Sequence, residues 1–328
     1  MKVIVSLLLI ISLTGYGQTV LESYFKQEGS FRYGEKPGDL IPLSKRGYTL
    51  ILPAAKDNLS GTLVMLEDSK PNLQDTSQKQ FIQIQQEANA KGLATLYIST
   101  GIPLDLYFSQ RSLQYVDSVW KDVFTKYKLP HNNIFLLGAM TSGHRALKYI
   151  EYCKTGKSLF NPDITGVVLS ESAIDWVRQW YECQKQVRDH LSETGFFEGN
   201  FITYLFKQYL EASPVTDIEK IIDFSPYSYF DTRMRKPKLF TDLAIRAYTF
   251  ADTRYWFSAQ GKGVYDSNYP DMSGFINEQK LAGNKNAELI VFHSNPDGPL
   301  ENDLRRQSST WDLVDTKELF DWIMSRLK

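Results

Sequence analysis

The stretch that decides the fold is "NNIFLLGAMTSGHRALKYIEYC", residues 132 to 153. It opens with a continuous apolar run, which is typical of a strand buried on both faces. The small residues of "GAMTSG" follow, and then a segment with helical periodicity. A strand that turns this sharply into a helix holds its apex residue at a positive φ, so the residues two before and two after the apex must be small.

Three registers of this turn can be compared. With Met140 at the apex, the flanking residues are Gly138 and Ser142, and both are small. With Thr141 at the apex the flanks are also small, but a β-branched residue at positive φ is an outlier. With Ser142 at the apex the flanks are Met140 and a histidine, which are too large. The sequence therefore predicts Met140 at the apex, where a thioether cannot be deprotonated to attack a carbonyl; an ordinary strand–turn–helix stays open as an alternative.

Strand-like and helix-like segments alternate along most of the chain. Residues 48–53, 61–68, 93–100, 133–138, 164–172 and 286–294 read as strands, as does the apolar part of 239–252. Residues 78–92, 112–130, 144–153 and 316–327 have helical periodicity. This alternation predicts an α/β fold with a mostly parallel central sheet and helices on both faces. Functional sites in such sheets form at the carboxyl ends of the strands.

Residues 176–224 interrupt the alternation with an aromatic, helical segment. We expect a cap inserted into the domain, whose aromatic residues form a core of their own and an apolar wall over a pocket. Three aspartates, Asp266, Asp271 and Asp297, are expected in loops, where turn roles account for them.

The N-terminus and the composition limit the class of protein. Residues 1–17 combine Lys2, an apolar run too short to span a bilayer and small residues at 15 and 17, which is a secretory signal-peptide pattern. We expect an exported mature chain, residues 18–328, with no membrane span. The net charge of -1 argues against nucleic acid as a partner.

Cysteine and histidine give no sign of a metal centre. Cys153 and Cys183 are the chain's two cysteines, and the sequence leaves open whether they form a disulfide or stay free. The four histidines are scattered and have no metal-ligand spacing. No cofactor and no metal are expected.

The order of strand, sharp turn, helix and helical cap, with "FSPYSYFD" after the cap and "STWDLVDTKELFDWI" at 309–323, resembles the α/β-hydrolase fold. The resemblance is to secreted serine esterases and prolyl-oligopeptidase-like hydrolases, and it covers roughly residues 45 to 327. It places Met140 at the nucleophile position, Asp252 at the acid position and Ser309 at the histidine position. The oxyanion region would comprise Glu67, Asp68 and Thr141, where the two carboxylates would oppose a developing negative charge.

We therefore expect a pseudo-hydrolase that lacks the nucleophile and the histidine and binds a small-molecule, peptide or protein partner. The alternative is an active esterase or peptidase-like hydrolase with a rewired triad, in which Thr141, Asp252 and His293 keep the required order. His144, just after the turn, is expected to face solvent or the cap. A third possibility, a structural interaction module, predicts a pocket filled by side chains.

Overall fold

The computed structural model describes residues 10–11, 18–32, 40–54, 59–73, 75, 79–190, 192–293 and 310–328. Ser309 lies outside the described residues, as do Asp297 and most of the expected signal peptide. Of the latter, only Ile10 and Ile11 are described; they form a short strand that pairs with Leu21 and Val20.

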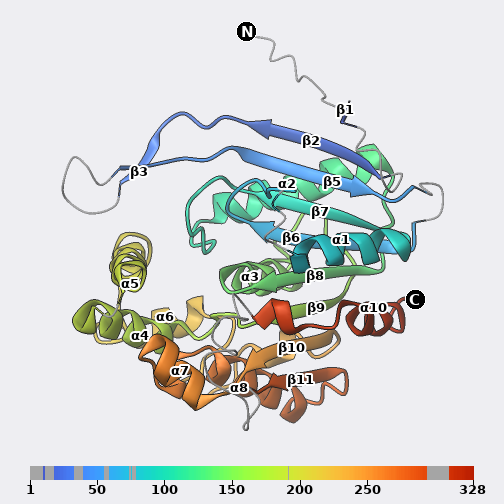
Figure 1. Ribbon diagram of the computed structural model, residues 1–328. Helices are drawn as coiled ribbons and strands as arrows, with labels where there is room; N and C mark the ends of the chain where they lie inside the picture. The colour runs from blue at the N-terminus through green and yellow to red at the C-terminus, as the bar shows by residue number, and fades with distance from the viewer. Residues whose placement is uncertain are drawn as a thin grey trace.

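In the described part of the chain, the main sheet has nine strands in the order β1-β2-β5-β7-β6-β8-β9-β10-β11 (Figure 1). The strands are β1 (Ile10–Ile11), β2 (Thr19–Phe25), β5 (Arg46–Leu52), β6 (Gly61–Glu67), β7 (Leu93–Ser99), β8 (Ile134–Ala139), β9 (Ile164–Ser170), β10 (Ala244–Phe250) and β11 (Ala287–Phe292). Pairing is parallel from β7 to β11 and antiparallel among β1, β2, β5 and β7. β3 (Ser30–Arg32) and β4 (Leu40–Pro42) form a separate two-stranded sheet. The predicted mostly parallel sheet is confirmed, whereas β2, β3 and β4 were not foreseen.

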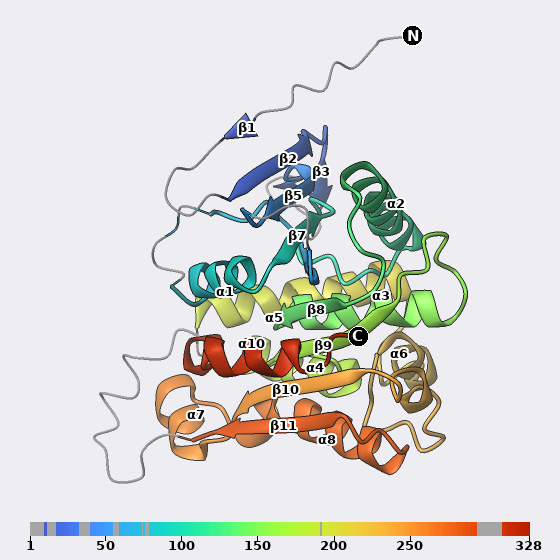
Figure 2. The ribbon, with the colours of Figure 1, turned by 90° about the vertical axis from the view of Figure 1, so that its right-hand side faces the viewer.

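Helices cover both faces of the sheet (Figure 2). One face carries α1 (Lys79–Ala90) and α10 (Thr316–Met324), whose apolar residues pack with those of β6 and β7. The other face carries α2 (Gln110–Tyr127), α3 (Thr141–Lys154) and α8 (Tyr269–Leu281). The apolar strands fit this arrangement because both of their faces are buried; β7, for example, has no exposed residue.

Local signals set the ends of these helices. Ser109 caps α2 by accepting a hydrogen bond from Arg111 N at 3.1 Å, and α2 ends at Lys128, which has a left-handed conformation, two residues before Pro130. α7 (Thr253–Gln260) begins at its N-cap Asp252 and ends at Gly261, also left-handed. These boundaries follow the residues that favour helix starts and stops.

The predicted cap segment is helical. It contains α4 (Trp176–Asp189), α5 (Glu193–Leu205), the π-helical turn η1 (Phe206–Leu210) and α6 (Ile218–Phe224), which gather beside the sheet in Figure 1. Their buried residues form a third apolar cluster, distinct from the two on the faces of the sheet. Three short 3-10 helices complete the described part: η2 (Pro237–Leu239), η3 (Val264–Asp266) and η4 (Thr310–Leu313).

The chain enters and leaves the cap at one place. Trp176 N donates to Ser225 Oγ at 3.0 Å, which joins the first residue of α4 to the residue after α6. Ser228 Oγ and Tyr229 N both donate to the carboxylate of Asp175 at 3.0 Å. These three bonds close the cap at its base, next to the carboxyl end of β9.

Candidate functional site

The sharp turn between β8 and α3 has its apex at Met140. The φ and ψ angles of Met140 are 51° and -121°, and its side chain is 55% exposed. A Cβ on Gly138 would lie 2.4 Å from Gly143 N, and a Cβ on Gly143 would lie 1.9 Å from Ser172 Oγ. Both positions therefore require glycine, and the backbone geometry is the one that the register argument expected. Whether Met140 replaces a nucleophile stays a prediction.

The two hydroxyls after the apex differ in their surroundings. Ser142 Oγ donates to Ala139 O at 2.7 Å and accepts from Ala139 N at 3.1 Å, so it is tied to its own turn. Thr141 is the first residue of α3 and lines the cavity described below. Thr141 is thus the hydroxyl residue next to the apex that faces open space.

Of the two orientations expected for His144, toward solvent or toward the cap, the structure shows the second: its side chain is fully buried and contacts the cap. Trp176 Nε1 donates to its Nδ1 at 2.8 Å, which leaves Nε2 as the protonated nitrogen that donates to Leu106 O at 2.9 Å. Burial, with the nearby charge of Lys148, holds the pKa of His144 well below its usual range. Both ring nitrogens are occupied, so His144 joins the cap to α3 and does not act as a base.

His293 follows β11 and is exposed, with Nδ1 3.0 Å from Ala251 O. The other two histidines pack on aromatic rings: His131 on Phe160 and His190 on Phe196. All four histidines of the chain lie in its described part, and none of them lines the cavity above Met140.

Asp252 lies just beyond the end of β10, but its carboxylate caps a helix. It accepts hydrogen bonds from Arg254 N at 2.8 Å and Tyr255 N at 3.3 Å. Thr141, Asp252 and His293, which are all described, make no hydrogen bond with one another, so this conformation does not assemble the rewired triad. The acid role of Asp252 stays a prediction.

The region expected to hold an oxyanion contains a cation that the sequence analysis missed. Arg145 is 1% exposed, and its Nη2 lies 3.3 Å from Asp68 Oδ2 while its Nη1 lies 4.0 Å from Glu67 Oε2. Its guanidinium also donates to Asp105 O at 2.6 Å and Leu66 O at 3.3 Å. Desolvation raises the pKa of Glu67 to about 7, although Arg145 opposes the shift. Arg145 thus balances carboxylates that the sequence alone leaves unpaired.

A cavity of about 530 Å³ opens above Met140, between the carboxyl ends of the strands and the cap. Its apolar lining comprises Leu104, Ala139, Met140, Ala173, Trp176, Ile202, Phe250, Tyr255, Trp256 and Trp311. Its volume lies within the range of small-molecule sites, roughly 300–1,000 Å³. The side chains of the described residues therefore leave this pocket open, contrary to what the structural-module alternative predicts.

Glu171 lines this cavity and was not singled out from the sequence. It follows β9 directly, has a φ of 44° and is 6% exposed. Its carboxylate accepts from Thr249 Oγ1 at 2.7 Å and from Phe250 N, and burial raises its pKa. The signal available in the sequence was its place at the end of a buried strand, in "VVLSES".

Asp271 corrects the expectation of a loop residue with a turn role. It lies in the first turn of α8 and is 1% exposed. Its carboxylate accepts from Ile174 N and Asp175 N, each at 3.0 Å, and pairs with Arg178. Burial and the charge of Asp271 raise the pKa of Asp175 to about 6. Asp271 therefore anchors the start of the cap to the sheet domain.

Both cysteines are free and buried, Cys153 in α3 and Cys183 in α4. Among the described residues, no group of three or more His, Cys, Asp or Glu side chains is placed to hold a metal ion. No helix in the described ranges is both long and apolar enough to cross a membrane.

Comparison with known proteins defines the fold. No family model matches the sequence, and no curated protein matches it. Solved structures do match: an S-formylglutathione hydrolase from Agrobacterium tumefaciens has a TM-score of 0.52 at 10% identity, covering 97% of this chain and 99% of that one. Carboxyl esterase 2 from the mycorrhizal fungus Tuber melanosporum has a TM-score of 0.53 at 12% identity, with coverages of 96% and 90%. MPT51 of Mycobacterium tuberculosis has a TM-score of 0.52 at 8% identity, with coverages of 93% and 99%.

The chain has the α/β-hydrolase fold. The predicted fold class is thus confirmed, while identities this low say nothing about activity.

Proposed function

We propose that this protein is an exported pseudo-hydrolase, which binds a small ligand in the cavity above Met140 without cleaving it. The observation that carries the proposal is the pairing of a positive-φ apex with a thioether side chain at the floor of an open cavity. A thioether has no proton to lose and cannot form an acyl intermediate.

The histidines support the same proposal. A serine or threonine nucleophile needs a base within hydrogen-bond reach, about 2.6–3.2 Å. None of the four histidines lines the cavity, and both nitrogens of His144, in the helix that follows the apex, are occupied. The export part of the proposal rests on the sequence of residues 1–17 alone.

The rival function is hydrolysis of an ester or peptide through a rearranged site. It is favoured by the hydroxyl of Thr141, which lines the cavity together with the buried carboxylate of Glu171. The structural neighbours named above include an esterase and a hydrolase.

The test is treatment of the purified, folded mature chain with a fluorophosphonate probe, followed by intact-mass analysis. We expect no adduct on the wild type or on Thr141→Ala. A stoichiometric adduct on the wild type would overturn the proposal, and its loss in Thr141→Ala would name the nucleophile.

Ligand binding is tested separately with a neutral, environment-sensitive naphthalene dye. Met140→Trp places a large ring on the floor of the cavity and is expected to abolish dye binding. Leu159→Trp is the matched control, since Leu159 is 87% exposed and precedes the amino end of β9, whereas the cavity lies at the carboxyl ends of the strands. Equal dye binding by both variants would show that the cavity is not the site.

A further inference from the structure

A short segment between α7 and α8 forms one side of the cavity above Met140. This segment, residues 261–268, is called the strap below. The strap residues that line the cavity are Lys262, Asp266, Ser267 and Asn268. Movement of the strap would therefore take away part of the cavity wall.

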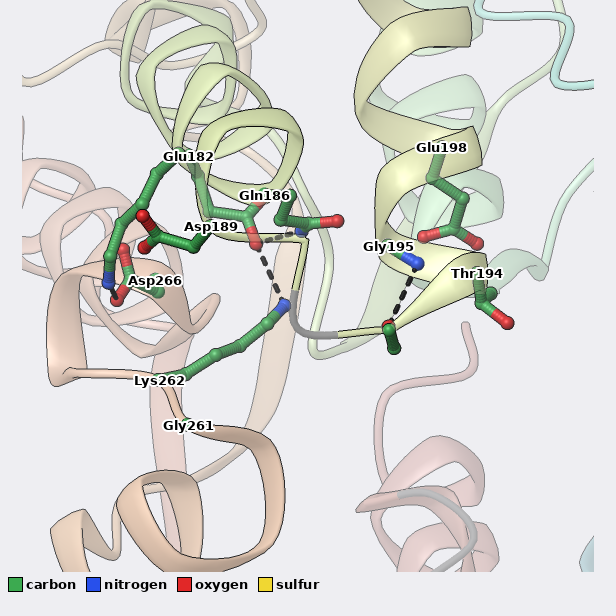
Figure 3. Close-up of a pocket in the computed structure, with 11 residues that line it drawn as sticks. Glu182, Gln186, Asp189, Thr194, Gly195, Glu198, Gly261, Lys262 and Asp266 are labelled. Carbon is green, nitrogen blue, oxygen red and sulfur yellow. Dashed lines mark hydrogen bonds and ion pairs between the residues drawn. The ribbon is translucent and has the colours of Figure 1, made fainter.

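A second cavity, called the outer cavity, lies between α4, α5 and the strap (Figure 3). It has a volume of about 370 Å³, and Ser192 and Thr194, which line it, are exposed. Lys262 and Asp266 line the outer cavity as well as the cavity above Met140. These two strap residues therefore belong to the wall of both cavities.

Two ion pairs join the strap to α4. Glu182 on α4 pairs with Lys262 at 2.8 Å, as Figure 3 shows, and Lys185 on α4 pairs with Asp266. The charges are reciprocal, because each segment contributes one carboxylate and one ammonium group. The lysines are partly exposed, at 27% for Lys262 and 36% for Lys185, so water can replace their partners.

The other end of the strap is held more firmly, by Arg178 on the same helix. Its Nη1 donates to Tyr265 O and its Nη2 to Asn268 Oδ1, each at 2.8 Å. Arg178 is 10% exposed and also pairs with Asp271, which is 1% exposed. Breaking buried contacts of a charged group is costly, so this end should stay in place when the ion pairs break.

Apolar packing contributes little to the attachment of the strap. None of residues 261–266 is buried, and none of residues 261–268, all of which the structure describes, belongs to the three apolar clusters. The strap begins at Gly261, whose φ of 61° is readily accessible to glycine. A segment with few buried apolar contacts opens at a lower free-energy cost than the core.

We infer that the strap is a gate. Its two ion pairs to α4 break to connect the cavity above Met140 with the outer cavity, and they form again to close it, while the contacts of Arg178 act as the hinge. This inference rests on the proposed function, because it describes how a ligand enters and leaves the same cavity.

The first test needs no ligand. Lys185→Met breaks the pair with Asp266, and Lys185 lines the outer cavity but not the cavity above Met140. The amides of Gly263, Asp266 and Ser267 are hydrogen-bonded within the strap. Hydrogen exchange of the peptide that contains them, followed by mass spectrometry, should be about threefold faster in Lys185→Met than in the wild type.

The second test measures ligand exchange by stopped-flow fluorescence with the neutral naphthalene dye. Opening of a gate speeds both entry and exit. Lys185→Met should therefore raise the association and dissociation rate constants by the same factor, about threefold, and leave the dissociation constant unchanged.

Two variants serve as controls. Lys185→Arg keeps the charge that pairs with Asp266 and should behave as the wild type does. Lys220→Met removes the same charge from another helix of the cap, α6; Lys220 is exposed and lines neither cavity, so this variant should also match the wild type.

The outcomes separate the gate from the proposed function. Unchanged hydrogen exchange of the strap in Lys185→Met overturns the gate whether or not a dye binds. A change in the dissociation rate constant alone also overturns it, because a residue that only shapes the cavity changes affinity. Equal acceleration in Lys220→Met would indicate a general effect of charge and refute the gate. If the wild type binds no dye, the proposed function and the gate fail together, whereas dye binding with unchanged rate constants refutes the gate alone.

Discussion

Replacing Met140 by glycine and by alanine tests whether the apex of the turn stores backbone strain. The φ and ψ of Met140, 51° and -121°, fit the first central residue of a type II′ turn, a position dominated by glycine. A side chain there costs roughly 1–3 kcal/mol. Both variants lose the same contacts beyond Cβ, so their difference isolates the backbone.

The sign of that difference is the diagnostic result. Relief of strain favours glycine by roughly 1–3 kcal/mol, and the flexibility of glycine in the unfolded chain costs about 0.5–1 kcal/mol. We therefore expect Met140→Gly to have a free energy of unfolding about 1 kcal/mol higher than Met140→Ala.

The assay is urea unfolding followed by circular dichroism, with the slope of each transition checked for a common value. Lys121, an exposed residue inside α2, provides the matched pair at an ordinary helical position. There the alanine variant should be the more stable by about 1 kcal/mol. If Met140→Ala is at least as stable as Met140→Gly, the apex is not strained and the reasoning fails.

Three further predictions concern ionisable groups whose charge state or reactivity the fold changes. Because the pKa of Glu67 is raised to about 7, the folded state holds a proton that the unfolded state releases, so stability should fall as pH rises from about 4.5 to 7. Glu67→Gln should flatten this part of the curve of thermal midpoint against pH. An unchanged curve would contradict the raised pKa. Asp271→Asn leaves Arg178 without its buried partner and should cost about 3 kcal/mol in urea unfolding, with faster proteolysis in the cap; intact cap resistance would refute the anchoring role. Cys153 and Cys183 should not react with a thiol reagent in the native protein, since burial raises both pKa values, and should release two thiols on unfolding; no thiol after unfolding would reveal a disulfide.

The sequence was sufficient for features that depend on local pattern. The apex of the turn follows from residue sizes within six positions, and the strands of the parallel sheet follow from continuous apolar runs. Asp252 was placed correctly beyond the end of β10, but its bonds to Arg254 N and Tyr255 N show a capping geometry that an acidic residue before any helix can adopt.

The features that the sequence could not provide depend on contacts between distant segments. Asp271 is nearly 100 residues from the amides of Ile174 and Asp175 that it binds. Arg145 meets Asp68 only because α3 packs across the end of β6. Ionisable residues at such positions look like solvated surface residues until the fold brings them together.

The closure of the cap at its base makes this segment exchangeable. Because Trp176 N and Ser225 Oγ are only 3.0 Å apart, a chain that links these two points needs no more than a short turn. Evolution can therefore lengthen, shorten or replace the segment without altering the spacing of β9 and β10, and so can an engineer. The sheet domain then serves as a platform whose cavity changes when this segment is replaced, while the turn at Met140 stays as it is.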